Sequence, residues 1–231
     1  MFDTEFALLA GLDRGDPLKE QTTWARTILT VVAKGLPGSR SSPEWKLMED
    51  MPEYFYFLVH LAVITDHSIH GIKEELLKIK DEFESIETLG SERYGVWDLV
   101  DWCESEEIGV DIHTGSYKVQ RDIFTGFFLL LRDGLFKSPE VLEPGSYGDD
   151  ILMEELRHFE YQYENDQKGW FGSSEKRKRG GAQDDSVFSL GSAIYSGRAL
   201  TPDDFRTRSR RSGGYFGGVI DTSFNLLGDY G

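Results

Sequence analysis

Three histidines and a glutamate recur at intervals of seven, three and four residues: His60, His67, His70 and Glu74. If one helix carries them, their side chains share a face, because these spacings return to the same side of a helix. Imidazole and carboxylate groups bind divalent metals, but a bundle site also draws ligands from facing helices, and the sequence identifies no such second set. We therefore interpret the four as a polar or partner-facing stripe. A metal site and a pH-sensitive contact surface are the alternatives.

A second group of candidates is acidic. Paired carboxylates can serve as acid and base when burial separates their pKa values, but a run on one polar helix face is usually solvated. The only cysteine, Cys103, lies within this run, and acidic neighbours disfavour its thiolate, so we expect a buried small hydrophobe. The carboxylates are Asp98, Asp101, Glu104, Glu106, Glu107 and Asp111.

Basic residues gather near the C-terminus. Arginine interleaved with aromatic residues can bind single-stranded nucleic acid through charge and stacking, and it can equally bind an acidic protein surface. We favour protein contact, because the rest of the chain is strongly acidic and repels phosphate. The predicted interaction residues are Lys176, Arg177, Lys178, Arg179, Arg206, Arg208, Arg210, Arg211, Tyr215 and Phe216.

The charge is unevenly distributed along the 231 residues, which carry a net charge of −16. Residues 168–231 hold ten Lys or Arg against seven Asp or Glu, a net of +3, which leaves −19 for residues 1–167. No P-loop, dinucleotide fingerprint, nucleophile elbow or H-E-x-x-H motif is present, and no motif resembles a known family. We therefore predict no catalytic residue, no cofactor and no enzymatic activity.

A heptad pattern is the strongest structural signal. Apolar residues between residues 52 and 89 alternate in steps of four and three, which predicts one long helix with a narrow seam. Charged residues surround the seam in its second half, whereas the first half is apolar on nearly every side, as in a bundle. The seam residues are Leu58, Ile69, Ile72, Leu76, Ile79 and Phe83.

The other segments also favour helices. Apolar spacing and Gly or Pro boundaries predict helices within residues 3–35 and 91–107, a core helix over 121–136 and an amphipathic helix over 149–165. Alternation about Thr114 predicts a small β-hairpin. The fold class expected is therefore mainly α, a helical bundle with one long heptad-patterned helix.

The last quarter of the chain changes character. Glycine occurs twelve times between residues 169 and 231, among isolated aromatic residues. A segment of this composition has too little apolar surface for its own core. We predict an acidic helical domain over 1–165 and an extended Gly/Arg-rich arm over 166–231.

These features favour a non-enzymatic structural or adaptor subunit whose arm binds neighbouring subunits, a layout shared by analogy with virus and phage particle components. The alternatives are a nucleic-acid-associated regulatory protein, a metal-dependent helical-bundle enzyme and an acidic inhibitor. The N-terminus lacks a basic region before its apolar run and no apolar run is long enough to span a bilayer, so we expect a cytoplasmic protein or one in an intracellularly assembled particle, with a nuclear location as an alternative. On this interpretation, a chain ending at Asn165 would stay folded and lose higher assembly.

Overall fold

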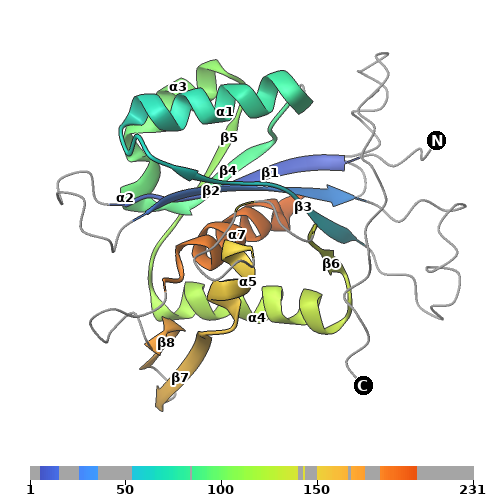
Figure 1. The fold of residues 1–231 in the computed structure, drawn as a ribbon, viewed down its shortest axis with the longest axis vertical. Helices are drawn as coiled ribbons and strands as arrows, with labels where there is room; N and C mark the ends of the chain where they lie inside the picture. The colour runs from blue at the N-terminus through green and yellow to red at the C-terminus, as the bar shows by residue number, and fades with distance from the viewer. Residues whose placement is uncertain are drawn as a thin grey trace, which may run out of the picture.

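A six-stranded mixed β-sheet forms the centre of the molecule (Figure 1). The computed structural model describes residues 6–15, 26–35, 54–83, 85–139, 143, 150–165, 168–174 and 183–201. The strand order is β5-β4-β1-β2-β3-β6. The strands are β1 (Phe6–Asp13), β2 (Thr27–Gly35), β3 (Phe55–Ile64), β4 (Thr88–Glu92), β5 (Gly109–His113) and β6 (Phe136–Lys137).

The sheet combines an antiparallel meander with parallel additions. Strands β1, β2 and β3 pair antiparallel in chain order, β4 joins β1 in parallel, β5 joins β4 in parallel, and β6 joins β3 in parallel. Helices cover both faces of this sheet (Figure 1), so its strands are apolar on both sides, as β2 shows by being buried at every position.

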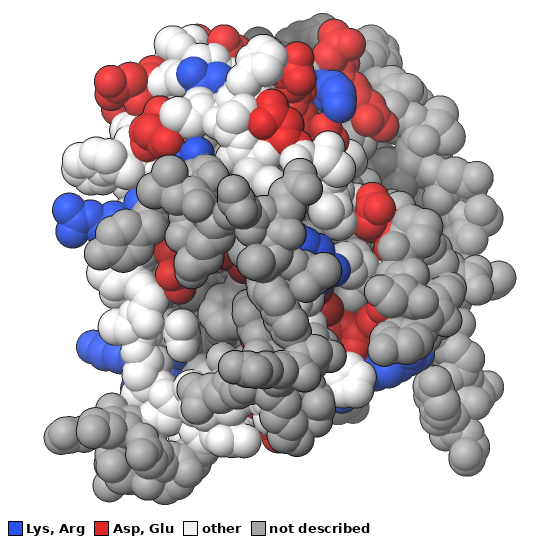
Figure 2. All heavy atoms as spheres, turned by 60° about the vertical axis from the view of Figure 1, so that its left-hand side comes forward, with Lys and Arg blue, Asp and Glu red and all other residues white. Residues whose placement is uncertain are grey.

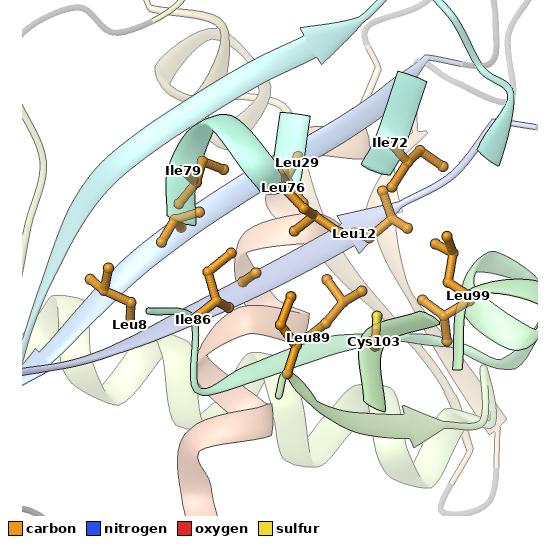
Figure 3. Packing of buried hydrophobic residues seen from close by; sticks show 14 of the residues in the cluster. Leu8, Leu12, Leu29, Ile72, Leu76, Ile79, Ile86, Leu89, Leu99 and Cys103 are labelled. Carbon is orange, nitrogen blue, oxygen red and sulfur yellow. The ribbon is translucent and has the colours of Figure 1, made fainter. Parts of the chain in front are cut away.

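One face is covered by the helices that follow β3 and β4. Ile72, Leu76 and Ile79 from the first of these helices pack on Leu8, Leu12 and Leu29 of the sheet (Figure 3). Cys103 lies at the same core and is fully buried, as the sequence predicted. The elements are α1 (Ile69–Phe83), α2 (Arg93–Val96), the 3-10 helix η2 (Trp97–Leu99) and α3 (Val100–Ser105).

The opposite face is covered by three helices, with a two-stranded hairpin beyond them (Figure 1). The last α-helix among the described residues lies directly on β1, β2 and β4, and ten of its twelve residues are buried. The elements are α4 (Tyr117–Arg132), α5 (Ile151–Leu156), α7 (Asp185–Ser196), the 3-10 helix η3 (Gly197–Ala199) and the strands β7 (Phe159–Asn165) and β8 (Lys168–Ser173).

Glycines in β1 and β4 bring α7 unusually close to the sheet. A Cβ atom at Gly11 would lie 1.9 Å from the Ser189 carbonyl oxygen, and one at Gly90 would lie 2.3 Å from that of Ser192. The Ser189 hydroxyl donates to the Gly11 carbonyl at 2.7 Å. Only glycine at these two strand positions leaves room for the helix backbone, since no side chain fits in the space.

The expectation of a mainly helical bundle is wrong, because the fold is α/β. The predicted long helix over 52–89 is strand β3, a turn, helix α1 and strand β4. Leu58 therefore lies on β3, while the other five seam residues lie on α1. Because β3 is apolar at nearly every position, its residues also fit the heptad spacing that α1 follows.

Four further expectations are corrected. Residues 6–13 and 27–35 are strands instead of helices, and β5 pairs in parallel with β4 instead of forming a hairpin about Thr114. The predicted helix over 149–165 is the short α5 followed by β7. Residues 183–201, expected in an extended arm, form α7 and η3. Residues 202–231 lie outside the described part of the chain, so the predicted domain division stays a prediction.

Two predicted helices are confirmed. The core helix is α4, which ends at Arg132 just before Gly134, whose φ of 67° suits glycine. The helical residues predicted over 91–107 appear as α2, η2 and α3. Each segment buries apolar residues at helical spacing, such as Ile123 and Phe127 in α4 and Val96, Leu99 and Cys103 in the other, although Phe128 and Trp97 are exposed.

We predict that Gly11→Ala lowers the unfolding temperature by roughly 5–10 °C, because the added methyl group collides with backbone and overpacking costs about 1–3 kcal/mol. Gly126→Ala is the matched control. It lies in α4 with open space around its Cα, so alanine should stabilise the helix by about 0.5–1 kcal/mol. Thermal melts followed by circular dichroism measure both, and an unchanged melt for Gly11→Ala would refute the close contact.

Candidate functional site

Two acidic residues end adjacent parallel strands. Asp13 is the last residue of β1 and Glu92 is the last residue of β4, each one position beyond the paired residues Leu12 and Ser91. Neighbouring strands lie about 4.8 Å apart, so the two carboxyl-bearing residues are side by side at one edge of the sheet.

Both residues face α7. Gly11 and Gly90, two positions earlier in their strands, lie against the backbone of α7. Residues two apart in a strand point to the same side, so Asp13 and Glu92 also face the layer that contains α7. Asp13 and Glu92 are half-buried.

The beginning of α7 supplies two more carboxylates at the same edge. Asp185 is one helical turn before Ser189, the residue that contacts Gly11, so it lies towards the end of β1. Asp184 and Asp185 expose only 4% and 3% of their surfaces. The backbone N–H of Ser173, at the end of β8, donates to Asp184 at 2.9 Å.

An arginine and a glutamate connect Asp185 to the neighbouring helix. Arg26 donates through Nε to Asp185 at 3.3 Å and also forms an ion pair with Glu155 of α5. The other oxygen of Glu155 accepts the Ser186 backbone N–H at 2.7 Å and the Ser186 hydroxyl. The network fixes the beginning of α7 against β2 and α5, because buried carboxylates require partners of this kind.

Glu92 is held in a poorly hydrated position. Burial raises the pKa of its carboxyl above the ordinary value, and a hydrogen bond with Gln120 of α4 opposes that rise. A Cβ atom at Gly115 would lie 2.9 Å from Glu92 Oε1, so the chain between β5 and α4 closes over this carboxylate. A cation beside Glu92 would relieve the cost of its buried charge.

A histidine extends the row of polar residues onto the next strand. His113 ends β5, pairs in register with Glu92 and contacts the Ser192 hydroxyl of α7 through Nε2 at 2.9 Å. Burial lowers the pKa of His113, which favours the neutral imidazole. His113 therefore fixes α7 to the edge without adding a positive charge.

The chemistry of this edge is that of hard oxygen ligands. Among the residues that the structure describes, no three His, Cys, Asp or Glu side chains form a ready-made metal site. Mg²⁺, however, is usually bound by one or two carboxylates, with water and substrate phosphates completing the octahedron. Asp13 and Glu92 provide two carboxylates on neighbouring strand ends, which is enough for such a magnesium site.

The predicted histidine stripe is dispersed by the fold. His60 on β3 contacts Glu75 at 3.1 Å, and His67 in the following turn contacts the Thr27 hydroxyl at 2.9 Å. His70 on α1 forms an exposed pair with Glu74 at 3.2 Å. These side chains make separate contacts, so the structure does not bring the stripe together.

The acidic run around α3 is not a site either. Three of its members form ion pairs, Asp98 with Arg14, Glu106 with Lys80 and Asp111 with Arg198. Burial raises the pKa of Cys103 to about 11, so its thiol is not ionised at neutral pH. The ten predicted basic and aromatic interaction residues lie outside the described part of the chain.

Sequence reasoning missed all four carboxylates at the edge. Asp13 follows a run of seven mostly apolar residues, and the Asp184–Asp185 pair begins a serine-rich helix, which is the local signal available. Nothing in the sequence connects these segments with Glu92. Their proximity comes from strand pairing and from the close contact of α7.

Acidic side chains also dominate the surface of one layer. Figure 2 shows more red than blue in the upper part of the view, over α1 to α3.

Within the described ranges, no helix is long and apolar enough to cross a membrane.

Comparisons with known proteins place the fold. No protein-family model matches the sequence, and no curated protein matches it. The structure is similar to the large terminase nuclease of thermophilic phage G20c, with a TM-score of 0.55 and 14% identity over 83% of this chain and 82% of that chain. It is similar to the large terminase nuclease domain of Thermus phage P74-26, with a TM-score of 0.53 and 16% identity over 83% and 80%.

A second structure of the G20c nuclease, with bound magnesium, has a TM-score of 0.53 and 15% identity over 84% of this chain and 82% of that chain. All three comparisons indicate a shared α/β fold. The expectation of a non-enzymatic structural or adaptor subunit is contradicted, because this fold is found in nuclease domains. Neither a regulatory protein nor a helical-bundle metalloenzyme fits the fold better.

We predict that Glu92→Gln raises the unfolding temperature at neutral pH by roughly 1–3 °C. In a chain of this size, that shift corresponds to a gain in the free energy of unfolding of less than about 1 kcal/mol. Burial raises the pKa of Glu92 in the folded state, so above that pKa folding must hold a poorly hydrated charge that glutamine lacks. Below the ordinary pKa both states of Glu92 are protonated, so the advantage should disappear in acid. Glu104→Gln, an exposed control on α3, should show no such pH-dependent gain in melts over a pH series.

Proposed function

We propose that this chain is a divalent-metal-dependent nuclease that hydrolyses phosphodiester bonds of DNA at the edge formed by Asp13, Glu92 and Asp185. One observation carries the proposal. Carboxylates end the adjacent parallel strands β1 and β4 on the side where two buried aspartates begin α7. The substrate class follows from the fold, since the similar structures are nuclease domains of phage large terminases.

Asp13 and Glu92 are the residues that would hold the metal. Both residues offer carboxylate oxygens at neighbouring strand ends, and a bound cation would offset the burial that raises the pKa of Glu92. When bound, Mg²⁺ would lower the pKa of a coordinated water and stabilise the charge that develops on the phosphate. One of the similar structures contains bound magnesium, and we propose the same metal for this chain.

Asp185 and Asp184 would complete the acidic edge in different ways. Asp185 shares Arg26 with Glu155, so its carboxylate is held against Arg26 at the beginning of β2. Asp184 accepts the Ser173 N–H and therefore positions the hairpin next to the site. Arg26 holds Asp185 in place and partly offsets the repulsion between the buried acids.

His113 and Gln120 would support Glu92 from two sides. His113 fixes α7 through Ser192, and Gln120 hydrogen-bonds Glu92 from α4. Gln120 therefore holds the carboxylate directly, whereas His113, the strand neighbour of Glu92, acts only by fixing α7 beside it. Preorganisation of this kind reduces the rearrangement required when substrate binds.

Because the chain is acidic, DNA phosphates can approach the carboxylates of the proposed site only when a bound cation neutralises part of their charge. A net charge of −16 repels phosphate, and the proposed edge adds further carboxylates. We therefore expect DNA to be cleaved only when divalent cations are present. We propose a DNA-packaging role inside a phage-infected cell, with other packaging proteins as further partners.

We predict that the purified protein nicks and linearises plasmid DNA in Mg²⁺ or Mn²⁺ and that EDTA abolishes the cleavage. Asp13→Asn and Glu92→Gln should each reduce the rate by at least about a hundredfold, because each removes a charged ligand. Gel analysis of cleavage over time measures this effect.

Asp81→Asn, an exposed change on α1 over the face of the sheet opposite α7, should cleave as the parent protein does. Melting curves with and without Mg²⁺ provide a second readout. The metal should raise the unfolding temperature of the parent protein and not that of Asp13→Asn. Cleavage that survives EDTA, or that survives Asp13→Asn, would contradict the proposal.

A further inference from the structure

An arginine and a tryptophan are displayed immediately after Glu92. Arg93 begins α2 and is exposed, and its guanidinium lies 5.4 Å from the ring centre of Trp97. Trp97 exposes 67% of its surface, the largest fraction among the large hydrophobic residues of the described chain. An exposed tryptophan beside a cation is costly to leave in water and is typical of a contact surface.

The element that carries these two side chains is rigid. Val96 and Leu99 on either side of Trp97 are fully buried in the core against the sheet. Asp98 accepts two contacts of 2.9 Å from Arg14 Nη1, which follows Asp13 at the end of β1. The Arg14 side chain is only 8% exposed, so this ion pair ties η2 to the same strand end that carries Asp13.

Arg14 also changes the electrostatics of this surface. Asp98 is the acidic residue next to Trp97, and its charge is paired. Because Arg14 pairs with Asp98, that carboxylate does not occupy Arg93. Arg93 is thus an exposed cation close to the carboxylates at the strand ends. A guanidinium in this position suits a phosphate, which it can contact through two parallel hydrogen bonds.

We propose that Arg93 and Trp97 form a binding surface for an unpaired stretch of DNA next to the proposed metal edge, an inference that rests on the proposed nuclease function. Arg93 contacts a backbone phosphate near the scissile one, and Trp97 stacks on a base. The base faces inside a duplex are covered by their neighbours, so a protruding indole ring can stack only on an unpaired or terminal base. The surface thus selects single-stranded or frayed DNA.

Binding is tested on the full chain carrying Asp13→Asn, so that DNA is not cut, by fluorescence anisotropy with labelled oligo(dT) and with a blunt duplex. Trp97→Ala should weaken oligo(dT) binding about tenfold and duplex binding less than about twofold. Arg93→Ala should weaken both and reduce the slope of log affinity against log salt by about 0.7, the value for one phosphate contact on a single strand.

Matched controls separate this surface from general effects. Phe128→Ala removes an aromatic residue that is 62% exposed on α4, and Arg132→Ala removes an exposed arginine at the end of that helix. Both should bind oligo(dT) as the parent does. If Trp97→Ala and Arg93→Ala match these controls, the proposal is overturned.

Plasmid cleavage by the parent protein distinguishes the two proposals. A parent that cleaves DNA, with a Trp97→Ala variant unchanged in oligo(dT) affinity, overturns the surface and leaves the nuclease. A parent that binds oligo(dT) through Trp97 and Arg93 but never cleaves overturns the nuclease and leaves the surface. A parent that cleaves and loses affinity for unpaired DNA with Trp97→Ala supports both.

Discussion

The close contact of α7 with β1 and β4 is the constraint on which the rest of the structure depends. Gly11 and Gly90 leave room for the helix backbone, and serine and alanine on the helix fill the remaining space. The two ends of α7 are then fixed separately. Glu155 accepts from Ser186 at the beginning, and the buried Lys34 ammonium donates to the carbonyls of Gly197 and Leu200 at the end. A helix held at three places cannot shift, so its first residues stay at the strand ends.

This arrangement concentrates buried acids at one edge, which is unfavourable in isolation. Asp184, Asp185 and Glu155 are each almost fully buried, and Arg26 is the cation that contacts two of them. Burial alone raises the pKa of Glu92. A fold optimised only for stability would replace such groups by apolar residues, because buried charges repay their desolvation only with good partners. Their presence is best explained by a function that uses negative charge, as a metal-dependent reaction does.

Local patterns gave a mixed account of the fold. Helix α4 was predictable, because one of its faces packs on α7 while the other is in water, so its periodicity reflects its environment. Strands β2 and β3 were not. A strand covered by helices on both faces is apolar throughout, and such a run carries no two-residue period. The nearly all-apolar run of β3 therefore fitted a heptad pattern as well as any other, and α1 followed it with true helical spacing.

The sequence by itself determined the acidic charge, the burial of Cys103, the position of α4 and the absence of a known catalytic motif. It could not identify the candidate site, whose members Asp13, Glu92 and Asp185 are separated by long stretches of chain. Only the tertiary structure decided that these residues lie at the same end of the sheet. The physical reason is that parallel pairing of β1 with β4, and glycine-mediated packing of α7 on both, are interactions between distant segments, whereas hydrophobic periodicity reports only what each segment buries locally.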